Sequence, residues 1–447
     1  MNPQVIGKCR WTICALLFFA TTVNYLDRQV LSLLAPALSK EFGWSNTDYA
    51  NITAVFQFGY AISMLFAGRF IDAIGTRRAF AIAVVVWSLG AMMHAFSVPI
   101  GAILVALGVG LPVSVAGFMV SRAVLALGEA GNFPAAIKAT AEYFPKKERS
   151  FATGIFNSGA NIGAILAPLT VPWIAVTWGW QMAFIAIGAI GFLWVALWLT
   201  FYDAPARQRR LGAAELAYIN SDREATAPAV EGAKVPWFRL LAHRQTWAFV
   251  VGKFLTDGVW WFYLFWLPKY LTGQYGMSTT DIALPLTVLY SMTMIGSIGG
   301  GWFPTYFMER GYKPYDGRMR AMLVIAFFPL VVLLAQPLGG ISYWLPVLLI
   351  GIGASAHQAW SANLFTTVSD MFPKRAIGSV VGIGGMAGGL GGVVVSKLGG
   401  WIFDAYGARG DLSTGYMIMF SICALAYLAA WAVMKALVPR HKEINEL

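Results

Sequence analysis

Long apolar stretches recur along almost the whole chain, and they constrain its fold more than any other feature. Hydrophobic residues make up 58% of the 447 residues, and charged residues only 12%. A helix of about 20 apolar residues spans the roughly 30 Å hydrocarbon core of a bilayer. A spanning segment must also satisfy its own backbone hydrogen bonds, which favours helices. The sequence therefore predicts an all-α polytopic membrane protein.

Apolar length, with charged or Pro/Gly-rich boundaries, divides the chain into twelve predicted helices. The first is too long for the apolar core of a signal peptide, so we interpret it as a retained helix. The stretch from Pro99 to Pro112 is also apolar, and we expect either an extended hairpin or a short re-entrant piece there. The predicted helices cover residues 11–35, 50–71, 79–98, 113–141, 150–174, 179–202, 246–271, 282–307, 319–337, 343–367, 376–403 and 414–437.

The positive charges are distributed unevenly between the loops. With both termini cytoplasmic, 25 of the 32 Lys and Arg residues fall in inner loops and tails, and three fall in outer loops. Cytoplasmic loops of membrane proteins carry such an excess, so the pattern favours cytoplasmic termini and an even number of helices. The formal charge of +11 is therefore explained by basic residues on the inner membrane face, and no nucleic-acid partner is expected.

Cysteine spacing and glycine motifs give no sign of a metal, redox or nucleotide site. Cys9, Cys14 and Cys423 lie in or beside apolar segments without metal or redox spacing. The glycine run from Gly378 to Gly400 lacks the Lys-Ser or Lys-Thr of a phosphate loop, so we interpret it as close helix packing. We expect no metal, no cofactor, no enzymatic activity and no ATP-driven transport.

One polar stretch, Asp203 to Arg244, separates six predicted helices from six others. Its prolines and clustered charges are typical of a cytoplasmic linker, with a short surface helix expected around Ala213 to Arg223. We predict an N-terminal six-helix bundle over residues 1–202, a linker over 203–244 and a C-terminal bundle over 245–447.

Short strings recur between these two halves at constant offsets. Phe144-Pro145-Lys146 recurs 228 residues later as Phe372-Pro373-Lys374, and Gly43 to Asp48 resembles Gly276 to Asp281 at an offset of 233. Repeated matches at constant offsets indicate two homologous halves. Parallel repeats that bind substrate near the bilayer midplane are a recurrent plan of secondary transporters.

The first predicted helix contains a carboxylate and a guanidinium side by side, Asp27 and Arg28. Charges inside a bilayer cost at least roughly 2.5 to 3.5 kcal/mol each, so such residues mark functional sites by default. An anion arriving at Arg28 would compete for the cation and favour protonation of Asp27. The alternative is a permanently neutralised pair that holds this helix against its neighbours.

Two further charged pairs lie inside predicted helices. Arg122 and Glu129 lie two turns apart on one face of the fourth helix, either as a permanent ion pair or as part of the transport machinery. Lys253 and Asp257, spaced i and i+4 in the seventh helix, are most simply a local ion pair.

The loop between the second and third helices reads Gly68-Arg-Phe-Ile-Asp72-Ala-Ile-Gly75-Thr-Arg77-Arg78. Gly68 would allow two helices to approach closely, and Asp72 could accept from a helix N-terminus or an Arg. Arg77 and Arg78 would hold the cytoplasmic side. The string resembles the signature loop of the major facilitator superfamily, except that Ala73 stands where Arg or Lys is usual. The resemblance implies two pseudo-symmetric six-helix bundles and alternating access.

Four further strings resemble the anion:cation symporters, and most closely the bacterial hexuronate (glucuronate/galacturonate) transporters. They are Tyr25 to Arg28, Gly128 to Pro134, Glu142 to Arg149 and Ala356 to Trp360, within a similarity that runs from Trp11 to about Lys435. The resemblance implies a proton-coupled symporter, monomeric in the bacterial inner membrane, that imports a sugar-acid anion. An aldonate such as galactonate or an aromatic acid is the alternative substrate, and a non-transporting sensor is a distant third reading.

The same resemblance implies roles for individual side chains. Asp27 and Glu129 correspond to the protonation sites of related aldonate and organic-anion carriers, and Arg28 would receive the substrate carboxylate. Tyr60 matches a contact to a substrate hydroxyl, and Asn157 lies near another.

Two residues of the C-terminal half match charged residues of the N-terminal half at the repeat offsets. His357 matches Glu129, and it either hydrogen-bonds substrate or packs helices. Trp261 matches Arg28, and it either stacks on a sugar or belongs to the interfacial aromatic belt. The full predicted substrate-binding set is Arg28, Tyr60, Asn157, Trp261, His357, Gln358 and Asn363.

Overall fold

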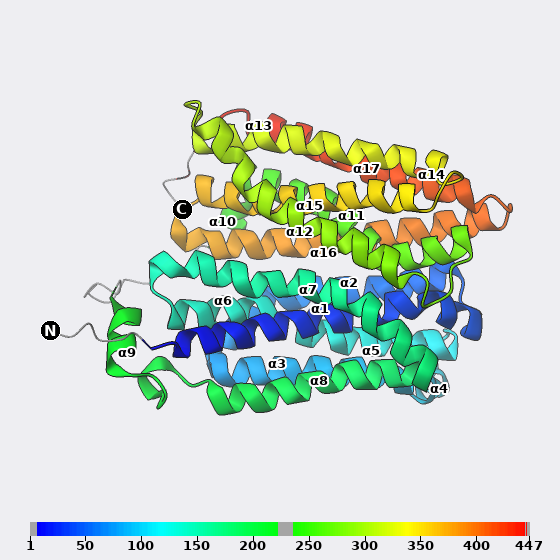
Figure 1. The fold of residues 1–447 in the computed structure, drawn as a ribbon, viewed down its shortest axis with the longest axis horizontal. Coiled ribbons are helices and arrows are strands. Elements are labelled where there is room, and N and C mark those ends of the chain that lie inside the picture. The colour runs from blue at the N-terminus through cyan, green and yellow to red at the C-terminus, as the bar shows by residue number, and fades with distance from the viewer. Residues whose placement is uncertain (1–6, 222–235, 443, 445–447) are drawn as a thin grey trace. The chain divides into compact units, whose positions relative to one another are not determined.

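The computed structural model describes residues 7–221, 236–442 and 444, and every regular element within these ranges is a helix (Figure 1). Ten helical stretches among the described residues are long and apolar enough to span a membrane. The two other predicted spans correspond to α11 (Arg244–Tyr275) and α15 (Trp344–Met371), helices of 32 and 28 residues. All twelve predicted helices are therefore present, and the all-α prediction is confirmed.

The two halves and the linker each contribute a consecutive series of helices. The N-terminal half contains α1 (Cys9–Phe42), α2 (Asn46–Ile74), α3 (Thr76–Met93), η1 (His94–Phe96), α4 (Ser97–Ala106), α5 (Val113–Glu129), α6 (Asn132–Tyr143), α7 (Lys146–Trp178) and α8 (Trp180–Phe201). The linker contains η2 (Pro205–Arg207), α9 (Ala213–Asn220) and α10 (Trp237–Leu241). The C-terminal half contains α11, α12 (Ala283–Met308), α13 (Pro314–Phe327), η3 (Phe328–Leu334), α14 (Ala335–Leu338), α15, α16 (Lys374–Gly407) and α17 (Leu412–Leu437).

The stretch from Pro99 to Pro112 extends the third helix instead of re-entering the membrane. The 3-10 turn η1 leads α3 into α4, and a short loop then returns the chain to α5. A Cβ atom at Gly101 would lie 1.8 Å from the carbonyl oxygen of Val113, and one at Gly117 would lie 1.8 Å from that of Ser97. Glycine at both positions lets α4 and α5 pack backbone to backbone, so the extended hairpin is the alternative that the structure confirms.

Glycine also allows the close packing of α3 on α5, which gives a testable prediction. A Cβ atom at Gly128 would lie 2.3 Å from the backbone nitrogen of Trp87. We expect Gly128→Ala to lower the free energy of unfolding by about 1–3 kcal/mol, because the helix backbone cannot yield to the added methyl group. Thermal unfolding measures the change. Gly154→Ala in α7 is the matched control, since no described atom outside its own helix lies within 4 Å of its Cβ position. Equal melting temperatures for the two variants would contradict the prediction.

Contacts divide the chain into two compact units whose limits differ from the predicted bundle boundaries. Unit 1 comprises Met1–Val30, Ile62–Ala167 and Ile174–Glu231. Unit 2 comprises Leu31–Ala61, Pro168–Trp173 and Gly232–Leu447. The end of α1 and the first part of α2 therefore group with the C-terminal half. The division into 1–202, 203–244 and 245–447, which follows the repeats, stays a prediction.

The predicted surface helix of the linker is α9, and it is anchored on unit 1. Glu215 of α9 accepts hydrogen bonds from the backbone nitrogens of Cys9 and Arg10, both at 3.1 Å, and pairs with the Arg10 guanidinium at 3.2 Å. Arg10 also pairs with Glu148 of α7 at 3.1 Å. These hydrogen bonds and ion pairs fix α9 against the start of α1. Residues 222 and 223 of the expected helix lie outside the described residues.

In unit 2, the beginning of α2 packs on α16 and α11. The Asp404 carboxylate of α16 accepts from the backbone nitrogens of Asn46 and Thr47, at 2.8 Å each, and so satisfies two amides at the start of α2. The Tyr49 hydroxyl donates to the carbonyl oxygen of Phe265 at 2.6 Å. These bonds fix the rotation and register of this part of α2 against its neighbours.

Candidate functional site

Arg28 of α1 and Glu129 of α5 form a buried ion pair in unit 1. Nε and Nη2 of Arg28 donate to Oε2 of Glu129 at 2.9 and 2.7 Å. The two side chains are 3% and 0% exposed. Oε1 of Glu129 has no hydrogen-bond partner within the described chain. Removing two charges from water costs several kcal/mol per ion, so each residue depends on the other for compensation.

Neighbouring side chains orient Arg28. Its Nη2 donates to Oδ1 of Asn24 at 3.3 Å, and its Cζ lies 4.7 Å from the ring centroid of Tyr25. Arg122, fully buried in α5, donates to the carbonyl oxygen of Arg28 at 3.3 and 3.4 Å. Glu129 thus pairs with Arg28, and Arg122 contacts the Arg28 backbone. Asn24 was not predicted from the sequence, although its i, i+4 spacing from Arg28 was a usable signal.

Asp27 is next to Arg28 in sequence but does not pair with it. The side chain is 2% exposed, and neither of its carboxylate oxygens has a hydrogen-bond partner among the described residues. Successive side chains on a helix point about 100° apart, so adjacent residues do not face each other. The alternative of a neutralised Asp27–Arg28 pair is therefore wrong. Arg28 pairs with Glu129 instead.

The loop between α2 and α3 connects to the rest of unit 1 through charged contacts. Asp72 pairs with Lys138 of α6 at 2.8 Å. Arg77 donates to the carbonyl oxygen of Leu199 at 2.6 Å. Gly75 has a φ of 82°, which favours glycine at this turn.

One prediction for this loop differs from the structure. Apart from its own helix, no described atom lies within 4 Å of a Cβ position at Gly68, so the expected close approach of a second helix there is wrong for this structure. Asp72 accepts from the side chain of Lys138 at 2.8 Å, a donor that the sequence did not predict. Arg78 is exposed.

Tyr60 and Trp261, two predicted substrate contacts, lie together in unit 2. Their ring centroids are 6.2 Å apart, and Phe56 lies 6.1 Å from Tyr60 and 5.9 Å from Trp261. Trp261 is only 6% exposed. Because it is enclosed by protein, the alternative of an interfacial aromatic belt is wrong for Trp261.

A second polar cluster of unit 2 surrounds His357. Its Nδ1 lies 2.9 Å from the Tyr427 hydroxyl, and its ring stacks on Trp260 with centroids 5.2 Å apart. Lys253 pairs with Asp257 at 2.5 Å, which confirms the predicted local ion pair. His357 is 3% exposed, so both of its contacts fit the helix-packing alternative.

The remaining predicted substrate contacts have different surroundings. Asn363 is buried, donates to the carbonyl oxygen of Gly300 at 2.7 Å and accepts from Arg318 at 3.3 Å. Its amide is engaged in helix packing. Asn157 in unit 1 is exposed, and Gln358 in unit 2 is half-buried.

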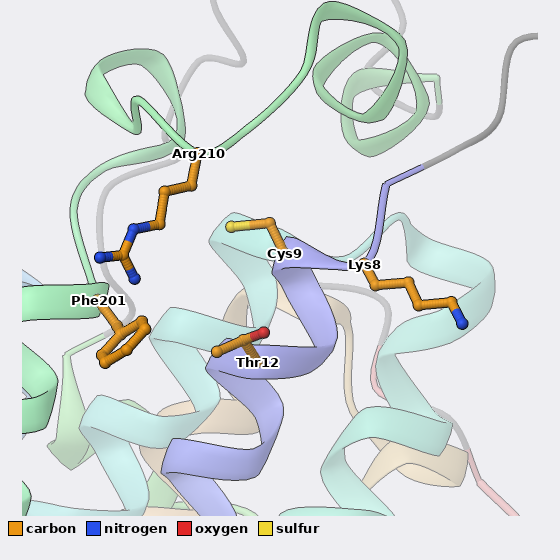
Figure 2. A pocket seen from close by; sticks show the side chains of 5 residues that line it. All are labelled: Lys8, Cys9, Thr12, Phe201 and Arg210. Carbon is orange, nitrogen blue, oxygen red and sulfur yellow. The ribbon is translucent and has the colours of Figure 1, made fainter.

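A cavity of about 300 Å³ opens at the start of α1 in unit 1, lined by Lys8, Cys9, Thr12, Phe201 and Arg210. Figure 2 shows the two cationic side chains pointing in different directions, with Arg210 turned towards Phe201. The Arg210 Cζ lies 4.1 Å from that ring centroid. The cations do not converge on one ligand position. Among the described residues, no group of three or more His, Cys, Asp or Glu side chains is placed to hold a metal ion.

Comparison with known proteins places these features in a family. The model of the Major Facilitator Superfamily matches residues 17–396. The chain is 31% identical over 432 residues to the hexuronate transporter of Escherichia coli strain K12, covering 96% of this chain and 95% of that protein. It is 26% identical over 448 residues to the D-galactonate transporter of Escherichia coli O6:H1, covering 98% and 96%.

A solved structure supports the fold independently. The chain is similar to a bacterial homologue of the human lysosomal transporter Spinster in an inward-facing, unoccupied conformation, with a TM-score of 0.73, 17% identity and coverage of 98% and 97%. This likeness concerns the fold alone. The family match and the near-full-length relatives together show that this multi-pass membrane protein belongs to the Major Facilitator Superfamily of transporters.

Proposed function

We propose that the protein imports a hexuronate, such as glucuronate or galacturonate, together with protons by alternating access. The observation that carries this proposal is the buried ion pair of Arg28 and Glu129. The guanidinium presents a planar fork that matches carboxylates, and Glu129 is itself a carboxylate on that fork. A sugar-acid carboxylate can therefore replace Glu129 at the same donors.

Coupling follows from one cation shared by two carboxylates. When the substrate carboxylate takes the Arg28 donors, Glu129 loses its counter-charge in a buried site. Burial without a cation favours the neutral carboxylic acid, so Glu129 takes up a proton. When Glu129 releases that proton, it returns to Arg28 and displaces the anion. Substrate and proton thus bind and leave together.

Asp27 is the second proposed proton-binding group, because it is buried without a hydrogen-bonded partner in the described chain. One proton carried with one monoanion is electrically neutral. Two protons would move a net positive charge inward, and the membrane potential contributes about 2.3 kcal/mol per charge per 100 mV. Protonation of Asp27 during the cycle would thus make uptake electrogenic.

The substrate class rests on the relatives as well as on the ion pair. The hexuronate transporter of Escherichia coli K12 supports a uronate, and the D-galactonate transporter supports an aldonate as the second candidate. Arg122, predicted as the partner of Glu129, is proposed instead to orient Arg28 through its backbone carbonyl. Gly68 to Arg78 remain the proposed conformational loop. The proposed substrate contacts besides Arg28 are Tyr60, Asn157, Trp261, His357 and Gln358; Asn363 is left out because its amide is engaged.

The charge distribution and the bacterial relatives support an inner-membrane location with both termini cytoplasmic. This orientation puts α9 and the loop of Gly68 to Arg78 on the cytoplasmic side. Sugar acids and protons would then enter the transporter from the opposite, outer side of the membrane.

Uptake into liposomes tests the proposal. We expect purified protein to accumulate glucuronate or galacturonate when the external solution is acidified, and a protonophore to abolish the accumulation. Galactonate and an aromatic acid serve as competing substrates, and protein-free liposomes serve as the control. Sealed vesicles with verified orientation that show no proton flux with any sugar acid would contradict the proposal.

A further inference from the structure

Gln57 of α2 is buried in unit 2 without a hydrogen-bonded side-chain partner. Its side chain is 0% exposed, and neither Oε1 nor Nε2 has a hydrogen-bond partner within the described chain. Burying an amide without a hydrogen bond is unfavourable, and an apolar side chain of similar size would avoid the cost. Buried polar groups in native proteins are rarely left unsatisfied without a reason. Packing alone therefore does not explain a glutamine at this position.

Glycines of α16 make the space that Gln57 occupies. A Cβ atom at Gly392 would lie 3.0 Å from Nε2 of Gln57 and 2.6 Å from Cδ1 of Trp261. A Cβ atom at Gly389 would lie 3.1 Å from the carbonyl oxygen of Gln57. Because any larger residue at these two positions would collide with α2 or with the indole, the glycines allow the amide and the ring to lie against the same stretch of α16.

Aromatic rings lie beside the amide on neighbouring turns. Tyr60 follows Gln57 by one turn of α2, and its ring centroid is 6.2 Å from that of Trp261. Phe56 lies 5.9 Å from Trp261. Ligand sites commonly combine aromatic walls with a few placed polar groups. Rings suit the C–H faces of a sugar, and an amide suits its hydroxyl groups, since it offers two N–H donors and a carbonyl acceptor.

We propose that Gln57 hydrogen-bonds hydroxyl groups of the transported sugar acid in a conformation in which α2 has separated from α16. These hydrogen bonds are lost when the two helices pack together as they do in this structure. This inference rests on the proposed function and adds a residue that recognises the hydroxyl-bearing part of the substrate. Affinity then differs between the two conformations, because only the separated one satisfies the amide. A ligand shifts a conformational equilibrium only through such a difference in affinity.

A thermodynamic cycle tests the proposal by combining the substitution of Gln57 with the removal of one hydroxyl group from the substrate. Purified full-length protein and its Gln57→Leu variant are titrated with glucuronate and with its monodeoxy analogues. For the unaltered protein, we expect at least one analogue to bind about tenfold more weakly than glucuronate, since a site built to bind a hydroxyl is left unpaired without it. For Gln57→Leu, we expect glucuronate and that analogue to bind alike.

The melting temperature of the ligand-free protein separates recognition from structure. Gln57→Leu should leave it unchanged or raise it by about 2 °C, because the unpartnered amide is gone. A structural role would lower it and would weaken every ligand equally. Gln57→Met, which keeps the side-chain length without the amide, replaces the leucine variant if that variant does not fold.

Controls distinguish failure of the inference from failure of the proposed function. Ser396→Ala removes a different fully buried polar group, in α16, that also lacks a partner in the described chain. This variant should still bind the monodeoxy analogue about tenfold more weakly than glucuronate. If Gln57→Leu and the unaltered protein lose the same affinity when the substrate hydroxyl is removed, and Arg28→Ala still loses binding, the inference is overturned but the proposed function is not. If the unaltered protein binds no sugar acid, the proposed function fails and the inference fails with it.

Discussion

Arg28→Ala is expected to lose about 100-fold or more in affinity for a sugar acid, because it removes the proposed carboxylate receptor from a buried site. Truncating one member of a buried, hydrogen-bonded charge pair typically costs about 2–5 kcal/mol, and each 1.4 kcal/mol is about tenfold in affinity. Binding of labelled glucuronate to purified protein measures the loss. Arg28→Lys should be intermediate, since it keeps the charge but not the fork.

The control for Arg28→Ala must separate lost binding from lost folding. The single variant leaves Glu129 buried without its cation, a defect of about 3–5 kcal/mol in comparable pairs. Combining it with Glu129→Gln removes both charges, so the double variant should recover thermal stability while remaining unable to bind. Normal affinity in either arginine-free protein would contradict the assignment of Arg28.

Glu129→Gln is expected to abolish proton-driven accumulation while retaining exchange of substrate across the membrane. Glutamine resembles the protonated glutamic acid, so Arg28 stays available to the anion, but position 129 no longer takes up and releases the proton that couples to Arg28. Substrate affinity should depend much less on pH than in the unaltered protein. Comparing acid-driven uptake with counterflow in the same proteoliposomes separates the two activities.

Two other carboxylate variants show whether the loss of accumulation is specific to Glu129. Asp27→Asn should keep accumulation but lower its sensitivity to membrane potential, if Asp27 carries the second proton. Glu142→Gln is the matched control in α6, where Glu142 is only half-buried and accepts from Thr76 at 2.7 Å. Accumulation at the original rate in Glu129→Gln would place proton coupling elsewhere.

The helices were predictable because the bilayer imposes a length and a polarity on each one. Apolar runs of the right length identified all twelve, and the structure extended most of them beyond the apolar limits: α1 ends at Phe42, and α11 ends at Tyr275. Helix ends continue into the headgroup region, where polar residues are no longer costly. The run from Pro99 to Pro112 stayed ambiguous because composition does not distinguish a longer helix from a second segment.

Some residues of the candidate site could be predicted from the sequence, but the ion pair that they form could not. Intramembrane charge singled out Asp27, Arg28 and Glu129. Which carboxylate meets Arg28 depends on how α1 packs on α5, and sequence adjacency suggested the wrong one. Gln57 was not predicted because it carries no charge, and the cost of an uncharged amide becomes visible only when its burial and partners are known.

The separation of Arg28 from its counter-charge also bears on how the protein enters the membrane. Glu129 follows Arg28 by 101 residues, which at about 5–20 residues per second is a delay of roughly 5 to 20 seconds during synthesis. Until then α1 has a cation with no carboxylate facing it, and its mean hydropathy of 1.2 is low among the candidate spans of the described chain. We therefore expect stable insertion of the first helix to depend on helices made later, so that this helix and α5 enter the membrane cooperatively.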